Sequence, residues 1–336
     1  MIPCSHPGPP HPPPQHGRAH LLYRGLTLPL LLLCGLSGIT LGARDSQRSG
    51  QRDGGERSGG NKRLYPEIPV TVAFTSDIEF GKGGGKPLLL DIAMPKQIPS
   101  GLMPAVIYVH GGGWFTGSKD EPNHKDKIIL LAENGFVAVS INYRLVGEAI
   151  FPAAIEDCKC AVRFLRGNAQ KYHLNPERIG AWGESAGGHL VQLMGTSDEG
   201  AGLDGKGGWE AISSRVQAVS TWYGMSDLIH GQSKIMEKGC MDFLGGTASE
   251  KAALYKLASP ISHVTRDDPP FLLVHGDQDP RCPLAQSQNL EKALGSVGIR
   301  AKLIVVPGGG HGFYQMPDKL RELYQETVAF FQETLK

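Results

Sequence analysis

One stretch of five residues, Gly183-Glu184-Ser185-Ala186-Gly187, most constrains the fold of this chain. The pattern Gly-x-Ser-x-Gly is typical of a sharp turn that holds a serine hydroxyl clear of the backbone, and a side chain at either glycine would crowd that turn. Many loops match the pattern by chance, so its surroundings matter. Residues 178–182 predict a short buried strand, and residues 188–194 predict an apolar helix. A strand, a turn that carries serine and a helix, in that order, are the setting that the motif requires.

Strands and helices alternate along the rest of the chain. We expect an antiparallel hairpin from residues 70–74 and 88–92, because a glycine-rich turn joins them. Further strands are expected at residues 105–109, 136–141, 216–222, 271–275 and 301–306, with helices near 127–134, 152–170, 285–294 and 317–334. This alternation predicts an α/β fold with a mostly parallel sheet and helices on both faces. Residues 225–261 lack strand patterning and predict a small cap-like insertion.

The N-terminal residues differ in composition from the rest of the 336-residue chain. Arg18 and Arg24 precede an apolar run at residues 26–36, and small residues follow, so residues 1–43 are interpreted as a signal peptide, with a start that could be misassigned. We expect no stable membrane span because the run is short, although an N-terminal anchor is the alternative to cleavage. Residues 44–63 contain no apolar residue and predict a disordered linker. The folded domain is therefore expected at residues 64–336, and the protein is expected to be exported, either periplasmic or secreted.

Charge and cysteine content narrow the function classes further. A formal net charge of +1 without a Lys/Arg run argues against nucleic-acid binding. Cys158 and Cys160 are two positions apart, which is not a metal-ligand spacing on a helix, and Cys158 is interpreted as a small buried thiol. A disulfide that involves Cys240 and Cys282 is left open. We expect no metal.

A serine hydroxyl needs an adjacent base to act as a nucleophile, and His311 is the best candidate. It lies between glycines directly after the last predicted strand, whose end meets the same sheet edge as Ser185. The acid should follow the preceding strand, where Asp277 and Asp279 compete. Asp279 is favoured because a turn separates it from the strand end, whereas Asp277 is expected to support that turn. The chain order Ser185, Asp279, His311 is the order of an α/β-hydrolase triad.

Backbone N–H groups that could stabilise an oxyanion are expected in His110-Gly111-Gly112-Gly113-Trp114. Gly112, Gly113 and Ala186 are the predicted donors, with Gly111 a substitute for one of them. The loop lacks the sequence of a phosphate-binding or dinucleotide-binding loop. His110 is interpreted as a support of the loop, and Glu184 as a hydrogen-bond partner near the nucleophile rather than the triad acid.

Taken together, His-Gly-Gly-Gly-Trp, Gly-Glu-Ser-Ala-Gly-Gly, His-Gly-x-x-Asp and Gly-His-Gly-Phe resemble the motifs of the α/β-hydrolase carboxylesterases. The most similar groups are the bacterial feruloyl/acetyl xylan esterases and the hormone-sensitive-lipase-like esterases. The resemblance covers roughly residues 64–336 and implies a sheet of about eight strands, a serine acyl-enzyme and no cofactor. The hairpin at the start of the domain favours the feruloyl/acetyl xylan side, because relatives of the other group begin with a helical cap.

The resemblance implies a serine esterase whose substrate is a small-molecule or polysaccharide-linked ester. Acetyl or feruloyl groups on plant polysaccharide are one candidate, and the alternatives are a small-acyl carboxylesterase, a formamidase or amidase, and a non-catalytic binding protein on the same scaffold. Trp114 and Trp222 are assigned either to the substrate pocket or to the core. The oligomeric state is not predicted.

Overall fold

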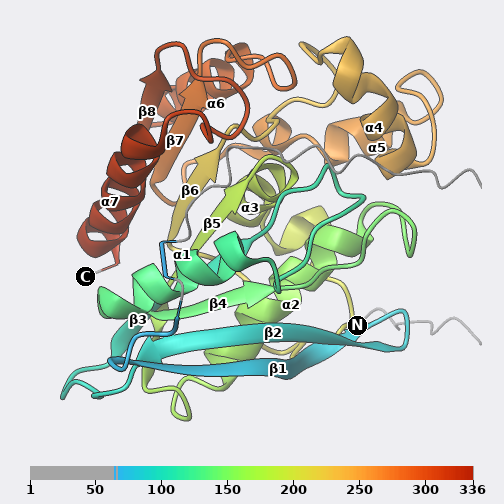
Figure 1. Ribbon diagram of the computed structural model, residues 1–336. Helices are drawn as coiled ribbons and strands as arrows, with labels where there is room; N and C mark the ends of the chain where they lie inside the picture. The colour runs from blue at the N-terminus through green and yellow to red at the C-terminus, as the bar shows by residue number, and fades with distance from the viewer. Residues whose placement is uncertain (1–63, 66, 336) are drawn as a thin grey trace, which may run out of the picture. The chain divides into compact units, whose positions relative to one another are not determined.

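The computed structural model describes residues 64, 65 and 67–335 of the chain. The predicted signal peptide and linker lie outside these residues. Eight strands form one sheet in the order β1-β2-β4-β3-β5-β6-β7-β8 (Figure 1). Their bounds are β1 (Val72–Gly83), β2 (Lys86–Pro95), β3 (Met103–Val109), β4 (Val137–Ile141), β5 (Leu174–Glu184), β6 (Ala218–Trp222), β7 (Phe271–Gly276) and β8 (Ala301–Val306).

Strand direction follows the prediction. β1 and β2 form an antiparallel hairpin, β2 pairs antiparallel with β4, and all other neighbouring strands are parallel. The hairpin is longer than predicted, because its turn is confined to Gly84 and Gly85, which have φ angles of 58° and 81°. Such positive φ angles favour glycine, which has no Cβ. The expected mostly parallel sheet of about eight strands is confirmed.

Helices cover both faces of the sheet, as its apolar strands require. Their bounds are α1 (Pro122–Glu133), α2 (Ala153–Gly167), α3 (Ala186–Thr196), α4 (Lys234–Leu244), α5 (Ala252–Leu257), α6 (Ala285–Ser296) and α7 (Pro317–Thr334). Side chains alternate along β3, so Val106 packs in one core with residues of α1 and α7, whereas Ile107 packs in the other with residues of α2, α3 and α6. Both cores consist of buried side chains, which explains the continuous apolar strands in the sequence.

The carboxyl ends of the parallel strands bring distant loops to one edge of the sheet. From β3 the chain crosses to β4 on one side, and it then returns to β5 on the other side of β3. Such a switch in strand order leaves a crevice at the carboxyl ends, where open α/β sheets bind their ligands. The loops after β3, β5, β7 and β8 all begin at this edge.

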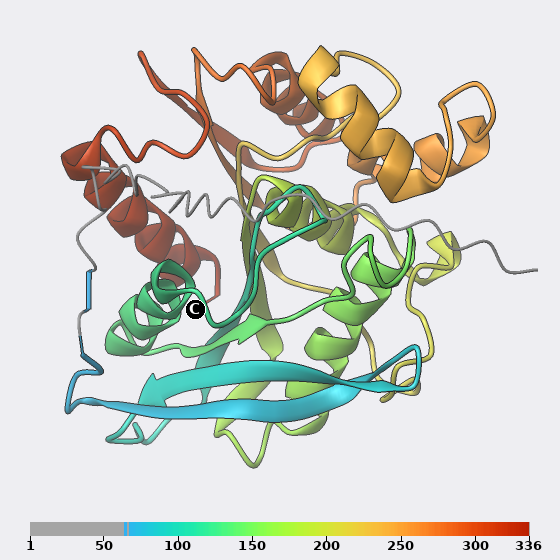
Figure 2. The same ribbon diagram turned by 45° about the vertical axis from the view of Figure 1, so that its right-hand side comes forward.

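Residues 225–261 contain no strand, as expected, and connect β6 to β7. The segment contains α4 and α5, the gold to orange helices at the upper right of Figure 2. Ser233 starts α4 as its N-cap, because its side chain accepts a hydrogen bond from the N–H of Met236. Among the described helices, none combines the length and the apolar character that crossing a bilayer requires.

The four described cysteines are buried free thiols, so no disulfide joins Cys240 to Cys282. Cys158 and Cys160 both lie on α2, both are buried, and the interpretation of Cys158 as a buried thiol is confirmed. Burial raises the pKa of the Cys160 thiol to about 11. Burial also raises the pKa of the other three described thiols, so all four are protonated near neutral pH.

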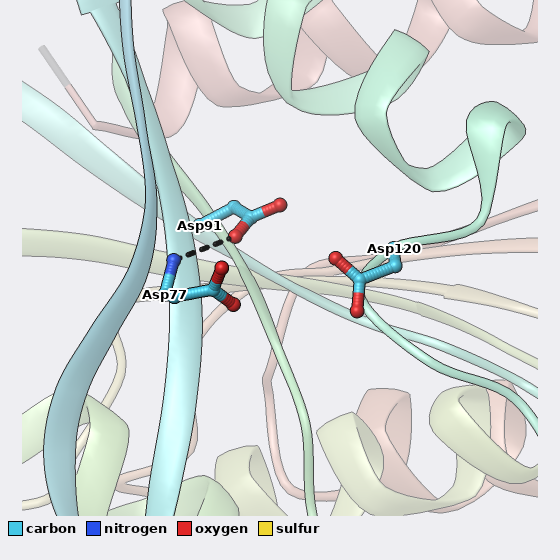
Figure 3. A group of neighbouring side chains, drawn as sticks. All are labelled: Asp77, Asp91 and Asp120. Carbon is cyan, nitrogen blue, oxygen red and sulfur yellow. Dashed lines mark hydrogen bonds between the residues drawn. The ribbon is translucent and has the colours of Figure 1, made fainter.

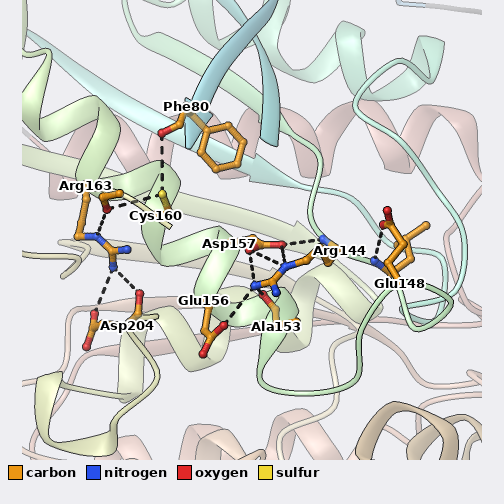
Figure 4. A network of polar contacts seen from close by, with 11 residues as sticks. Phe80, Arg144, Glu148, Ala153, Glu156, Asp157, Cys160, Arg163 and Asp204 are labelled. Atoms are coloured by element: carbon orange, nitrogen blue, oxygen red, sulfur yellow. Dashed lines mark hydrogen bonds and ion pairs between the residues drawn. The ribbon is translucent and has the colours of Figure 1, made fainter. Parts of the chain in front are cut away.

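A buried polar network fixes the loop after β4 to α2 (Figure 4). The Arg144 guanidinium donates to both carboxylate oxygens of Asp157, and the backbone N–H of Arg144 donates to the same carboxylate at 2.8 Å. Asp157 is 1% exposed. Glu156 accepts from the same guanidinium at 3.1 Å but is more exposed. Since Arg144 follows Tyr143, which contacts the loop after β3, the network also positions part of the candidate site.

We expect Asp157→Ala to lower the free energy of unfolding by about 3 kcal/mol, because it leaves a guanidinium and a backbone N–H of Arg144 without their main acceptor. Glu156→Ala is the matched control, with an expected loss below about 1 kcal/mol because its ion pair is partly solvent-exposed. Urea denaturation of the two variants and the unmodified chain measures both values. Equal stability of Asp157→Ala and Glu156→Ala would contradict this interpretation.

Candidate active site

Ser185 occupies the turn between β5 and α3 in a backbone conformation that is rare for a residue with a side chain, with φ 55° and ψ −117°. A Cβ on Gly183 would lie 2.3 Å from the carbonyl oxygen of Gly187, and a Cβ on Gly187 would lie 2.1 Å from that of Val109. Both distances are far below a van der Waals contact. The predicted steric reason for the two glycines is therefore confirmed.

The structure brings Ser185, His311 and Asp279 together in a continuous hydrogen-bonded chain. The His311 Nε2 lies 2.8 Å from the Ser185 hydroxyl oxygen, and Nδ1 lies 2.7 Å from the Asp279 carboxylate. A carboxylate only accepts hydrogen bonds, so a neutral His311 carries its proton on Nδ1, and Nε2 accepts from the serine hydroxyl. This geometry lets the imidazole take the serine proton.

Asp279, and not Asp277, faces the histidine. The other Asp279 carboxylate oxygen accepts from the backbone N–H groups of Arg281 and Cys282 at 2.8 and 2.9 Å. Burial acts to raise the pKa of Asp279, but the hydrogen bonds from His311 and the two N–H groups outweigh it, so the pKa lies below its usual value. Asp277 instead accepts from the N–H of Gly308 at 2.7 Å, in agreement with its expected role in the turn.

His275 supports the loop that carries Asp279. It is fully buried, and its two ring nitrogens lie 2.7 Å from the Ser287 hydroxyl and 2.8 Å from the Cys282 carbonyl oxygen. Burial lowers the pKa of His275, so the ring is neutral near pH 7 and donates one of these bonds. The sequence analysis placed His275 in a motif without giving it this role.

The glycine-rich loop after β3 faces Ser185. Gly112 and Gly113 have φ angles of 111° and 63°, which residues with a Cβ rarely adopt. Within residues 67–335, neither of their backbone N–H groups has an acceptor. Ala186 is the first residue of α3, so its N–H has no partner within that helix. The three predicted oxyanion donors therefore have N–H groups without such partners, close to the serine.

His110 and Tyr143 support this glycine-rich loop. Their rings stack with centroids 4.3 Å apart, and the Tyr143 hydroxyl donates to the His110 carbonyl oxygen at 3.0 Å. Burial lowers the pKa of His110 to about 4, so the ring is neutral. These contacts agree with the interpretation of His110 as a support of the loop.

A cavity of about 370 Å³ contains Ser185 and His311. Met236 of α4 lines it, so the insertion at residues 225–261 contributes to its wall. The other lining residues used below are Glu121, His124, Glu184, Tyr223, Arg281 and Tyr314. Cavities of about 490 and 830 Å³ elsewhere on the described chain contain neither Ser185 nor His311, so volume alone would misplace the site.

The pocket assignment of Trp114 and Trp222 is wrong, and the core alternative is confirmed. Trp114 is 1% exposed and stacks on Phe243, and Trp222 is fully buried and stacks on Tyr324. Neither side chain lines the cavity with Ser185. Large apolar rings after strand ends are as useful for packing as for binding, which is why the sequence could not separate the two roles.

A buried ion pair lies next to the nucleophile. The Lys127 Nζ lies 3.1 Å from one Glu184 oxygen, and the Tyr223 hydroxyl donates to the other at 3.1 Å. The Tyr223 ring packs on the His311 ring with centroids 4.7 Å apart. Glu184 is thus a hydrogen-bond partner, as predicted, and it holds a residue that contacts the histidine. The sequence analysis missed Lys127 and Tyr223, although Tyr223 directly follows a predicted strand at the sheet edge.

Three aspartates form the described group of side chains whose spacing could suit a metal ion (Figure 3). Asp77, Asp91 and Asp120 each lie 2.7 or 2.8 Å from the Lys119 ammonium, which is completely buried. The lysine therefore supplies the cation at this point, and we assign no metal to the group. The cluster fixes the segment that follows the glycine-rich loop to the β1–β2 hairpin.

Replacing Lys127 with methionine is expected to destabilise the fold by about 3–5 kcal/mol, because it leaves the buried Glu184 carboxylate without its counter-charge. The double variant Lys127→Met/Glu184→Gln should recover most of that loss, since no uncompensated charge remains. Chemical denaturation of both variants tests the pair. A double variant that is no more stable than the single one would argue against the charge as the cause.

Comparison with protein families gives an independent result. Residues 90–294 match the BD-FAE family. Esterase LipQ of Mycobacterium tuberculosis is 34% identical over 276 residues, which are 79% of this chain and 64% of LipQ. The acetyl esterase of Salmonella enteritidis is 28% identical over 68% of this chain and 72% of its own length. The chain thus spans less than two thirds of the LipQ sequence.

Solved structures agree with the family match. A truncated carbohydrate esterase from gut microbiota superposes with a TM-score of 0.65 at 30% identity, covering 76% of this chain and 96% of that one. An acetyl ester-xyloside bifunctional hydrolase from Caldicellulosiruptor lactoaceticus gives a TM-score of 0.65 at 25% identity, covering 77% and 96%. The chain therefore belongs to the BD-FAE family and has the α/β-hydrolase fold.

Proposed function

We propose that the chain is a serine carboxylic-ester hydrolase that acts through an acyl-enzyme. The observation that carries this proposal is the hydrogen-bonded chain from Ser185 through His311 to Asp279. It lies beside a glycine-rich loop in which the N–H groups of Gly112 and Gly113 have no acceptor among residues 67–335. The similarity to named esterases supports the same reaction class. A binding protein without activity would not need all of these groups in catalytic geometry.

In the proposed mechanism, the Ser185 hydroxyl attacks the ester carbonyl while His311 Nε2 takes its proton. The negative charge that develops on the carbonyl oxygen is stabilised by the N–H groups of Gly112, Gly113 and Ala186. His311 then protonates the departing alcohol, and the acyl group stays on the serine. Water, deprotonated by His311, attacks this acyl-enzyme and releases the acid. Asp279 keeps the imidazole in the required tautomer throughout.

The proposed substrate is a short-chain, preferably acetyl, ester of a polar alcohol such as a plant polysaccharide. The cavity supports a polar alcohol because Glu121, Glu184 and Arg281 line it. The carbohydrate esterase and the acetyl ester-xyloside hydrolase among the similar structures also support an ester of a polar alcohol. A small-acyl carboxylesterase is the second candidate, favoured by the similarity to LipQ and the acetyl esterase. Export from the cytoplasm is part of the proposal and rests on the N-terminal sequence.

Ser185→Ala is expected to lower kcat/KM for 4-nitrophenyl acetate by at least about 10⁴-fold, because no other group can accept the acyl chain. The variant keeps the fold, since alanine removes only the hydroxyl. Steady-state assays with purified protein measure the effect. Turnover at the unmodified rate would exclude the serine mechanism.

Asp279→Asn and Asp277→Asn form a matched pair that identifies the acid. We expect a loss of up to about 10⁴-fold in kcat for Asp279→Asn, because an amide cannot hold His311 in the required tautomer. Asp277→Asn should retain most of the activity, since only a turn contact changes. A larger loss at position 277 would reverse the assignment.

A substrate panel separates the candidate reactions. It spans acyl chain length, acetylated xylan, methyl ferulate and a formamide, and kcat/KM is compared for each. We expect acetyl esters to be preferred over long-chain esters because the cavity is small and carries charged groups. Preference for the formamide would instead identify an amidase.

A further inference from the structure

Arg281 stands out among the residues that line the cavity with Ser185 and His311. It lies two positions after Asp279, in the loop that follows β7, and its side chain is exposed. The proposed mechanism gives it no role. The sequence analysis did not identify it either, because Arg281 lies after the end of the His-Gly-x-x-Asp motif.

The backbone of Arg281 is fixed from two directions. Its N–H donates to the Asp279 carboxylate at 2.8 Å, and its carbonyl oxygen accepts from the Ser233 hydroxyl at 2.5 Å. Ser233 is the N-cap of α4, whose Met236 also lines the cavity. The backbone of Arg281 is therefore held both by the loop that carries Asp279 and by the insertion at residues 225–261.

In the part of the chain that the structure describes, the Arg281 guanidinium has no ionic partner. Most other charged groups near the site are paired, as Lys127 is with Glu184. Within residues 67–335, no carboxylate lies in ion-pairing distance of the Arg281 side chain, and no acceptor contacts the N–H groups of its guanidinium. An arginine offers five donors in a planar arrangement that matches a carboxylate in a bidentate pair. Arg281 thus adds a donor group of this kind to the lining of the cavity.

The remaining charges of the cavity favour one orientation of a charged substrate. Glu121 lines the cavity from the segment that leads into α1, and the nearby His124 does not neutralise it, because burial lowers the pKa of His124 to about 3. The charge of Glu184 is offset by Lys127, 3.1 Å away. An anionic group is therefore repelled from the Glu121 side and attracted to the Arg281 side.

We propose that Arg281 binds a carboxylate carried by the ester substrate and so sets specificity for anionic esters. This inference rests on the proposed ester hydrolysis and adds a substrate class to it. The carboxylate could belong to the alcohol, as in an acetylated uronic acid residue, or to the acyl group, as in a half ester of a dicarboxylic acid. In both cases the substrate carries one negative charge on a carboxylate that is not part of the ester to be hydrolysed.

Two substrate pairs distinguish the two positions of the carboxylate. On the alcohol side the pair is 4-acetoxybenzoate and its methyl ester, and on the acyl side it is 4-nitrophenyl hydrogen succinate and its methyl ester. For each pair, the ratio of kcat/KM for the anionic to the neutral member is measured in the unmodified protein and in Arg281→Gln. Comparing the ratios between proteins cancels the intrinsic reactivity of the two esters.

We expect Arg281→Gln to lower the ratio by about threefold to tenfold for at least one pair, the range of a partly exposed charge-assisted contact. Arg281→Lys should keep part of the preference, because it retains the charge but loses the bidentate geometry. The preference of the unmodified protein should also weaken as salt is raised. Arg266→Gln, which removes another exposed arginine outside the cavity, is the control and should leave both ratios unchanged.

Unchanged ratios in Arg281→Gln for both pairs would overturn the inference. Turnover of 4-nitrophenyl acetate, measured in the same preparations, separates this result from failure of the proposed function. If that neutral ester is hydrolysed and the ratios do not move, only the role of Arg281 is wrong. If no ester is hydrolysed, the proposed function itself fails.

Discussion

The strained turn at Ser185 is the constraint on which the rest of the site depends. A residue with a side chain is held at a φ of 55°, and this conformation survives only because Gly183 and Gly187 leave room for the carbonyl groups around them. The turn places the serine hydroxyl at the carboxyl edge of the sheet. Every other group of the site is arranged around that position.

Three separate buried contacts hold the surrounding loops in place. The Lys127–Glu184 pair holds Tyr223 against the ring of His311, and the Lys119 cluster fixes the segment after the glycine-rich loop. His275 supports the loop of Asp279 from inside the core. Buried polar groups are costly unless they are satisfied, so these contacts connect the stability of the fold to the geometry of the site. Catalytic groups held in this way need little rearrangement during a reaction.

Much of this arrangement could be predicted from the sequence, because motifs after strand ends have few structural solutions. Ser185, Asp279 and His311 were placed together by that reasoning, and the structure joins them by hydrogen bonds. The sequence could not show whether Trp114 and Trp222 line the pocket or lie in the core, since their burial depends on the packing of α4 and α7. Lys127, Tyr223 and Arg281 were missed because their importance comes from contacts between segments far apart in the chain. Contacts between distant segments produce no recognisable spacing of residues in the sequence.

The central claim is that Ser185 is an activated nucleophile, and covalent labelling tests it most directly. The full chain is treated with a fluorophosphonate, which reacts with serine only where a base activates the hydroxyl, and the adduct is mapped by peptide mass spectrometry. The account predicts one adduct per chain, on the peptide that contains Ser185, and no adduct in Ser185→Ala. An adduct on another residue, or equal labelling of the variant, would contradict it.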